Sequence, residues 1–129
     1  MNRSRGFTLI ELLIVMTIAV IHAGVGLTLY GTSVTRAKEA ALSEDLFQMR
    51  KAIDEYYADK QKYPSSLDAL VSEKYLREIK PDPFTQSVDS WQTTMSEPDA
   101  ANASAETGIW NVKSGATGTG SDGRPYSEW

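Results

Sequence analysis

FTLIELLIVMTIAVIHAGVGLTLY, residues 7–30, is the stretch that decides the fold of this chain. It is apolar except for Glu11, His22 and three threonines. As a helix rising ~1.5 Å per residue, it is long enough to cross the ~30 Å hydrocarbon core of a bilayer. The stretch therefore predicts a membrane-spanning and assembly helix over residues 7–31.

The short leader before this stretch, MNRSRG at residues 1–6, sets the topology and the processing that we predict. Its arginines, Arg3 and Arg5, favour a cytoplasmic N-terminus, although Arg36 and Lys38 beyond the span weaken the charge asymmetry. A secretory signal has its small-residue cleavage site after the apolar region, whereas Gly6 comes before it here. A cut after Gly6 would keep the helix on the mature protein and create a new amine about one helical turn from Glu11.

These residues carry a resemblance to a known family. RGFTLIELLIVMTIAVI, residues 5–21, resembles the class III signal of type IV pilins and type II secretion pseudopilins. In that family, prepilin peptidase cuts after the glycine and methylates the new amine, which here belongs to Phe7. YPSSLDALVSEKYLREIKPDPF, residues 63–84, is similar to the segment that follows the long helix in major pseudopilins.

The family helix commonly carries a proline near its middle, where this chain has Thr28. Gly24 and Gly26 stand just before it, and each glycine weakens a helix by roughly 1 kcal/mol relative to alanine. We therefore predict that these two glycines supply the flexibility that proline gives elsewhere.

Composition argues against two other classes of protein. Without its leader the chain has 11 basic and 17 acidic residues, a net charge of 11 − 17 = −6, so it has no basic stripe for binding nucleic acid. It has no cysteine, and its single histidine lies in the span, so neither a disulfide framework nor a catalytic constellation is expected. We predict that the protein is not an enzyme.

Helical spacing continues beyond the span, and we expect one helix from Phe7 to Lys60. Its second half carries an apolar face that predicts a domain core: Leu42, Leu46, Met49, Ile53 and Tyr56. The carboxylates on this helix are interpreted as a solvated face. The charged residues around the apolar face are Arg36, Lys38, Glu39, Glu44, Arg50, Lys51 and Glu55.

The remainder predicts a small α+β domain over residues 32–129, packed on the second half of the long helix. Tyr63-Pro64 ends that helix, and a short helix capped by Ser65 or Ser66 runs to Ser72. Two antiparallel strands are expected at Val88–Met95 and Gly108–Lys113, joined by a polar loop, with Trp91 and Trp110 in the core. The glycine-rich residues 114–129 should contain no regular element and should fold back to bury Trp129.

Two polar features of the sequence are candidate sites. His22 could serve as a proton or metal site, or it could be a neutral imidazole near the outer membrane face or at a subunit contact; the second interpretation is favoured because no other histidine or cysteine completes a site. Asp122 and Ser121, with nearby carbonyls, could hold Ca²⁺. The resemblance also implies calcium in this loop, although the chain lacks the aspartate of the usual S-x-A-D-G pattern.

The resemblance implies a structural subunit of a type II secretion pseudopilus. Such a subunit is a single-pass protein of the bacterial inner membrane with a periplasmic domain, and it assembles with copies of itself into a periplasmic filament that exports folded proteins. Its other partners are prepilin peptidase, the inner-membrane assembly platform and minor pseudopilins. Two alternatives stay open: a type IV pilin of a surface fibre, and a membrane-anchored periplasmic binding module, which would have no need of Glu11.

Overall fold

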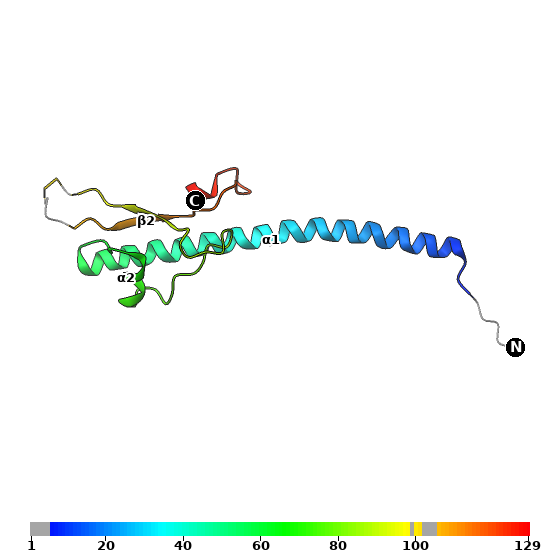
Figure 1. Cartoon of the computed structure of the whole chain (residues 1–129), viewed down its shortest axis with the longest axis horizontal. Coiled ribbons are helices and arrows are strands. Elements are labelled where there is room, and N and C mark those ends of the chain that lie inside the picture. The colour runs from blue at the N-terminus through cyan, green and yellow to red at the C-terminus, as the bar shows by residue number, and fades with distance from the viewer. Residues whose placement is uncertain (1–5, 99, 102–105) are drawn as a thin grey trace. The chain divides into compact units, whose positions relative to one another are not determined.

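The computed structural model describes residues 6–98, 100–101 and 106–129. The chain is α+β, as predicted, and divides into two compact units, Met1–Arg36 and Ala37–Trp129. The helix α1 (Leu9–Lys60) runs through both units (Figure 1). It begins two residues later than predicted because Thr8 caps it, and it ends where expected, at a left-handed Gln61 (φ 55°) just before Pro64.

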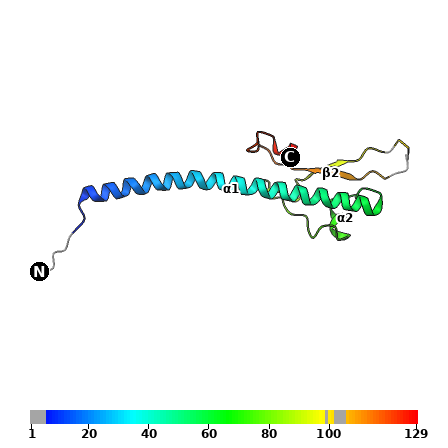
Figure 2. The ribbon, with the colours of Figure 1, turned by 180° about the vertical axis from the view of Figure 1, so that it is seen from behind.

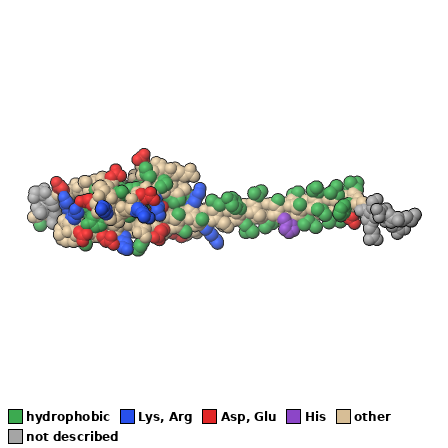
Figure 3. Space-filling view, turned by 90° about the horizontal axis from the view of Figure 1, so that it is seen from below, with side chains coloured by type: hydrophobic (Ala, Val, Ile, Leu, Met, Phe, Trp, Pro, Cys, Tyr) green, Lys and Arg blue, Asp and Glu red, His purple; other side chains and the backbone are tan. Residues whose placement is uncertain are grey.

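The α1 residues of the first unit present their apolar side chains to the outside. Hydrophobic side chains cover this part of the helix in Figure 3. The most apolar 18-residue segment of α1 has no buried residue. Threonine hydroxyls donate to the carbonyl four residues earlier, for example Thr17 to Leu13 at 2.8 Å. These hydroxyls therefore have acceptors within their own helix. A helix of this length and composition fits a membrane span.

The second unit has a core built on the apolar face of α1 that the sequence predicts. We call its five residues the α1 stripe: Leu42, Leu46, Met49, Ile53 and Tyr56. All five residues of that stripe are buried, with Leu42 and Ile53 fully inaccessible. The rest of the unit and one further α1 residue complete the buried apolar core: Ala52, Leu70, Trp91, Ile109, Val112, Ala116 and Tyr126. Helical periodicity therefore identified most of the core that α1 contributes.

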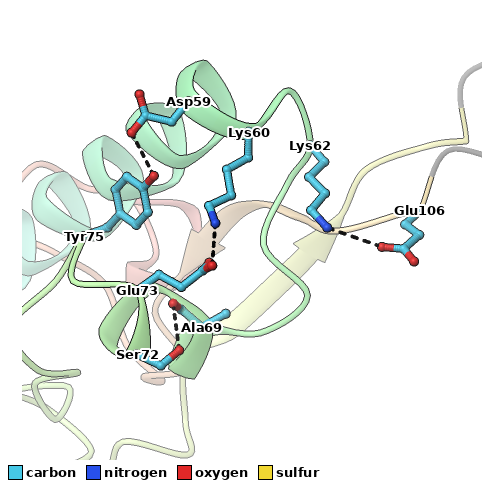
Figure 4. A network of polar contacts seen from close by, with 8 residues as sticks. All are labelled: Asp59, Lys60, Lys62, Ala69, Ser72, Glu73, Tyr75 and Glu106. Carbon is cyan, nitrogen blue, oxygen red and sulfur yellow. Dashed lines mark hydrogen bonds and ion pairs between the residues drawn. The ribbon is translucent and has the colours of Figure 1, made fainter.

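The short helix α2 (Leu67–Ser72) follows the turn at Pro64 and is capped as predicted. The Ser66 hydroxyl accepts the Ala69 N–H at 3.2 Å. Figure 4 shows how the residues after α2 return to the end of α1: Glu73 pairs with Lys60, and the Tyr75 hydroxyl donates to Asp59 at 2.8 Å. These contacts hold the residues after α2 against the end of α1, with Leu70 of α2 buried in the core.

Two strands, β1 (Gln92–Met95) and β2 (Ile109–Lys113), form an antiparallel sheet. In Figures 1 and 2 the sheet lies along one side of the second half of α1, and α2 lies on the other side. The first strand is shorter than predicted because Ser87 and Ser90 form a local turn: Ser87 Oγ accepts the Asp89 N–H, and the Ser90 hydroxyl donates to the Ser87 carbonyl.

Trp91, just before β1, and Trp110, within β2, differ in burial. Trp91 is 6% exposed and its indole donates to the Lys80 carbonyl at 2.9 Å, as a core residue should. Trp110 is 48% exposed, so its prediction as a core residue was wrong. Met95 pairs with Ile109 and Thr94 with Asn111, which leaves Trp110 as the extra residue of a β-bulge. The bulge lets both Ile109 and Val112 face the core.

The polar loop between the strands is closed at its base. The Ser96 N–H donates to the Gly108 carbonyl at 2.7 Å, and Ser96 Oγ accepts the Gly108 N–H. Residues 99 and 102–105 of this loop lie outside the described residues.

The glycine-rich tail folds back on the second unit, as predicted. Trp129 is partly buried and packs edge to face on Tyr126, with ring centroids 5.3 Å apart. The prediction that the tail contains no regular element was wrong. The tail forms a β-bridge between Thr119 and Pro125 and the 3-10 turn η1 (Tyr126–Glu128). Gly118 has φ 112°, a conformation that glycine adopts without strain, at the start of this turn region.

Candidate functional site

The N-terminal site is organised by reciprocal hydrogen bonds between Thr8 and Glu11. Glu11 Oε2 accepts the Thr8 N–H at 3.1 Å, and Thr8 Oγ1 accepts the Glu11 N–H at 3.3 Å. This is a capping box, which satisfies two backbone donors at the start of α1. The negative side chain also lies at the helix end where the dipole favours it.

The sequence contained the signal for this cap, because Thr8-Leu9-Ile10-Glu11 matches the S/T-x-x-E pattern before an apolar run. We did not predict it. Its consequence is that Glu11 has a partner within its own chain. Because the Thr8 N–H is an amide on the C-terminal side of Gly6–Phe7, a cut at that bond would leave this partner in place.

The predicted processing residues, Gly6 and Phe7, lie just before α1 and are accessible. Both are exposed; the Phe7 side chain is 92% exposed, and no atom lies within 4 Å of where a Gly6 side chain would begin. The rest of the predicted leader, residues 1–5, lies outside the described residues. The described residues therefore leave the Gly6–Phe7 bond exposed, and cleavage at this bond stays a prediction.

The other polar features of the span have partners along the helix. His22 Nδ1 lies 2.8 Å from the Ile18 carbonyl oxygen, the geometry of a hydrogen bond to the preceding turn, and the choice between its two interpretations stays a prediction. Gly24 and Gly26 are helical, and open space surrounds the point where a side chain would begin at either of them. Their predicted role concerns motion and stays a prediction.

An exposed apolar helix of membrane-spanning length, with its cap preceded by an exposed glycine, fits a membrane anchor. Residues 1–27 match the family model described as the prokaryotic N-terminal methylation motif. This motif is type IV pilin-like, and the match covers the leader and the first part of α1. Comparison with curated proteins and with solved structures gives no match to the chain.

A second polar cluster joins the tail to α1 within the second unit. Glu39 is 7% exposed, and its Oε1 accepts hydrogen bonds from the Ser121 N–H and the Tyr126 hydroxyl, both at 2.9 Å. Its Oε2 accepts the Ser121 hydroxyl at 2.6 Å. These bonds, first that from the Ser121 hydroxyl, lower the pKa of Glu39 despite the opposing effect of burial. Glu39 was predicted to be solvated, and that prediction was wrong.

The predicted calcium ligands do not fit a calcium site as the structure places them. Both oxygens of Asp122 are bound by Arg124, through the backbone N–H at 3.0 Å and Nε at 2.8 Å. The Ser121 hydroxyl donates to Glu39. Calcium takes six to eight oxygen ligands, and among the described residues no group of three or more acidic, histidine or cysteine side chains could hold a metal. Calcium binding itself stays an untested prediction.

Two further polar residues of the second unit were missed from the sequence. Asp82 is fully buried, where its oxygens accept the Phe84 N–H at 2.9 Å and the Ser114 hydroxyl. Arg50 is partly buried and donates to Asn111 and to the Val112 carbonyl. Burial lowers the pKa of Arg50. Both residues hold loops and strands to α1, so their roles are in the fold.

Proposed function

We propose that this protein is a structural subunit of a type II secretion pseudopilus. It is held in the bacterial inner membrane by the first part of α1, with its N-terminus in the cytoplasm and residues 37–129 in the periplasm. Prepilin peptidase cuts between Gly6 and Phe7 and methylates the new amine. The assembly platform then extracts the subunit into a filament made mainly of its own copies, with minor pseudopilins as further partners.

The observation that carries this proposal is Glu11 in the first turn of an exposed apolar helix, five residues after the exposed Gly6. The methylation motif over residues 1–27 supports the same processing. A carboxylate costs up to about 2.5–3.5 kcal/mol at the centre of a bilayer, which is more than the ~0.5–2 kcal/mol that a helix cap typically contributes. The sequence segment at residues 63–84 and the absence of cysteine favour the pseudopilin over the fibre-forming pilin.

In the proposed assembly step, Glu11 of a subunit already in the filament receives the Phe7 amine of the incoming subunit. Methylation keeps that amine positive, so the two charges neutralise each other in a medium of low dielectric and fix the axial register. The capping box holds the carboxylate at the end of α1 before it is paired. It therefore reduces the side-chain entropy that forming the pair would cost.

The test separates charge pairing from helix capping by comparing Glu11→Gln with Glu11→Leu. A glutamine keeps an acceptor for the Thr8 N–H but removes the charge, whereas leucine removes both. If the charge matters, both variants should insert, lose residues 1–6 and be methylated by intact mass, yet form no filaments and support no secretion. Normal filaments from Glu11→Gln would leave only a capping role. Normal filaments from both would eliminate the assembly role.

The filament itself is identified by electron microscopy of cells that overproduce the protein, with and without the secretion machinery. Short filaments that need this machinery are expected. Long surface fibres formed without it would instead identify a type IV pilin. A mature protein that begins after the apolar stretch would exclude both, because the assembly helix would then be missing.

A further inference from the structure

We propose that Glu39 closes the C-terminal tail in place of a metal ion, so that the order of the tail does not depend on calcium. The carboxylate comes from α1, and all three of its donor atoms belong to the tail. We call Glu39, Ser121 and Tyr126 the tail clasp. This inference concerns the second unit alone and does not depend on filament formation.

The tail clasp holds the tail in one conformation, as a bound cation does in a loop of oxygen ligands. A cation stabilises a loop by coordinating its carboxylate and carbonyl oxygens. Glu39 stabilises this loop by accepting hydrogen bonds from its N–H and O–H groups. Among the described residues, no lysine, arginine or histidine forms an ion pair with Glu39. Its charge is stabilised by hydrogen bonds alone, which a buried carboxylate with several donors permits.

The turn that presents these donors is closed by its own contacts. The Gly120 N–H donates to the Arg124 carbonyl at 2.8 Å, and the Tyr126 N–H donates to the Gly118 carbonyl at 3.1 Å. A side chain at Gly120 would begin 2.4 Å from the Trp129 ring, so the turn and the indole are in direct contact. The indole therefore fills the inner side of the turn at Gly120.

The aromatic side of the clasp extends the tail into the core. The Tyr126 ring is buried and stacks on Phe84, with centroids 4.2 Å apart, while its hydroxyl reaches Glu39. Loss of the carboxylate therefore leaves the Tyr126 hydroxyl and both donors of Ser121 without their acceptor. Opening should then spread through the turn from Gly118 to Tyr126, because these residues are held by the same few contacts.

The experiment measures amide hydrogen exchange over residues 117–129 in the full-length protein in detergent micelles, with ~5 mM calcium or with a chelator, a range that covers the weaker protein calcium sites. Wild type should exchange equally slowly in both. Glu39→Gln should raise exchange in this segment roughly tenfold or more, because bonds to a charged acceptor are lost. Glu55→Gln, an exposed acid on the same helix, should have no effect on the segment.

Two further variants keep the test decisive if Glu39→Gln does not fold. Ser121→Ala and Tyr126→Phe each remove donors and should give smaller increases in exchange over the same residues. The proposal is overturned if calcium slows exchange in wild type and Asp122→Asn abolishes that response. It is equally overturned if Glu39→Gln, or both donor variants, exchange like Glu55→Gln.

Discussion

Replacing Ser114 by alanine should destabilise the second unit more than any other loss of a single oxygen atom described above. Ser114 is fully buried; its hydroxyl donates to Asp82, and its oxygen accepts the Ala116 N–H at 3.1 Å. Losing a bond to a charged acceptor costs about 1.5–3 kcal/mol, and an unpaired buried N–H adds about 1–3 kcal/mol. The variant should therefore lose at least ~2.5 kcal/mol.

For a domain of this size each kcal/mol corresponds to roughly 4–8 °C, so the melting temperature should fall by at least ~10 °C. Tryptophan fluorescence is a suitable assay because all three tryptophans lie in residues 37–129. Ser72→Ala is the control, since its exposed hydroxyl bonds only a helix carbonyl, and it should change stability by less than ~0.5 kcal/mol.

A double-variant cycle then isolates the contact itself. Asp82→Ala, Ser114→Ala and the combined variant should show a coupling energy of about 1–3 kcal/mol, because the two side chains share one bond. If the combined loss equals the sum of the single losses within ~0.5 kcal/mol, the bond contributes nothing and the reasoning fails. A cost below ~1 kcal/mol for Ser114→Ala would also refute it.

The remaining predictions concern three other parts of the second unit. Trp91→Ala should cost about 3–5 kcal/mol, whereas Trp110→Ala should cost less than ~1 kcal/mol; equal losses in denaturant unfolding would contradict the burial of the first and exposure of the second. Gly120→Ala should lower the melting temperature by displacing Trp129, and an unchanged value would show that the indole moves freely. Because the folded pKa of Glu39 is lowered, its contribution to stability is present above its ordinary value of 4.5 and is lost as pH falls through the lower folded pKa. The difference in melting temperature between wild type and Glu39→Gln should therefore shrink from pH 7 to pH 3, and a constant difference would argue against this linkage.

The sequence predicted the parts of the fold that depend on local pattern. The spacing of Leu42 to Tyr56 identified the buried face of α1, and Ser66 was recognisable as the cap of α2 because both signals lie within a few residues. The Thr8–Glu11 cap has an equally local signal and was recoverable in principle.

The contacts that were missed join residues far apart in sequence. Glu39 and Ser121 are 82 positions apart, and a lone acid on the polar side of an amphipathic helix has the same local pattern whether it is solvated or buried. Trp110 was misplaced for a different reason. A tryptophan in an apolar strand is expected in the core, but Trp110 is the extra residue of a β-bulge and is turned outward. No residue type in the sequence predicts that bulge.

The late position of the residues that cover the α1 stripe has a consequence for how the protein is made. Leu42 to Tyr56 emerge first, but the side chains that bury them lie between Leu70 and Tyr126. During synthesis this apolar face stays open until most of the second unit has followed it, because contacts over such separations form only after the intervening chain is available. The nascent protein should therefore need a chaperone on this face during and after membrane insertion.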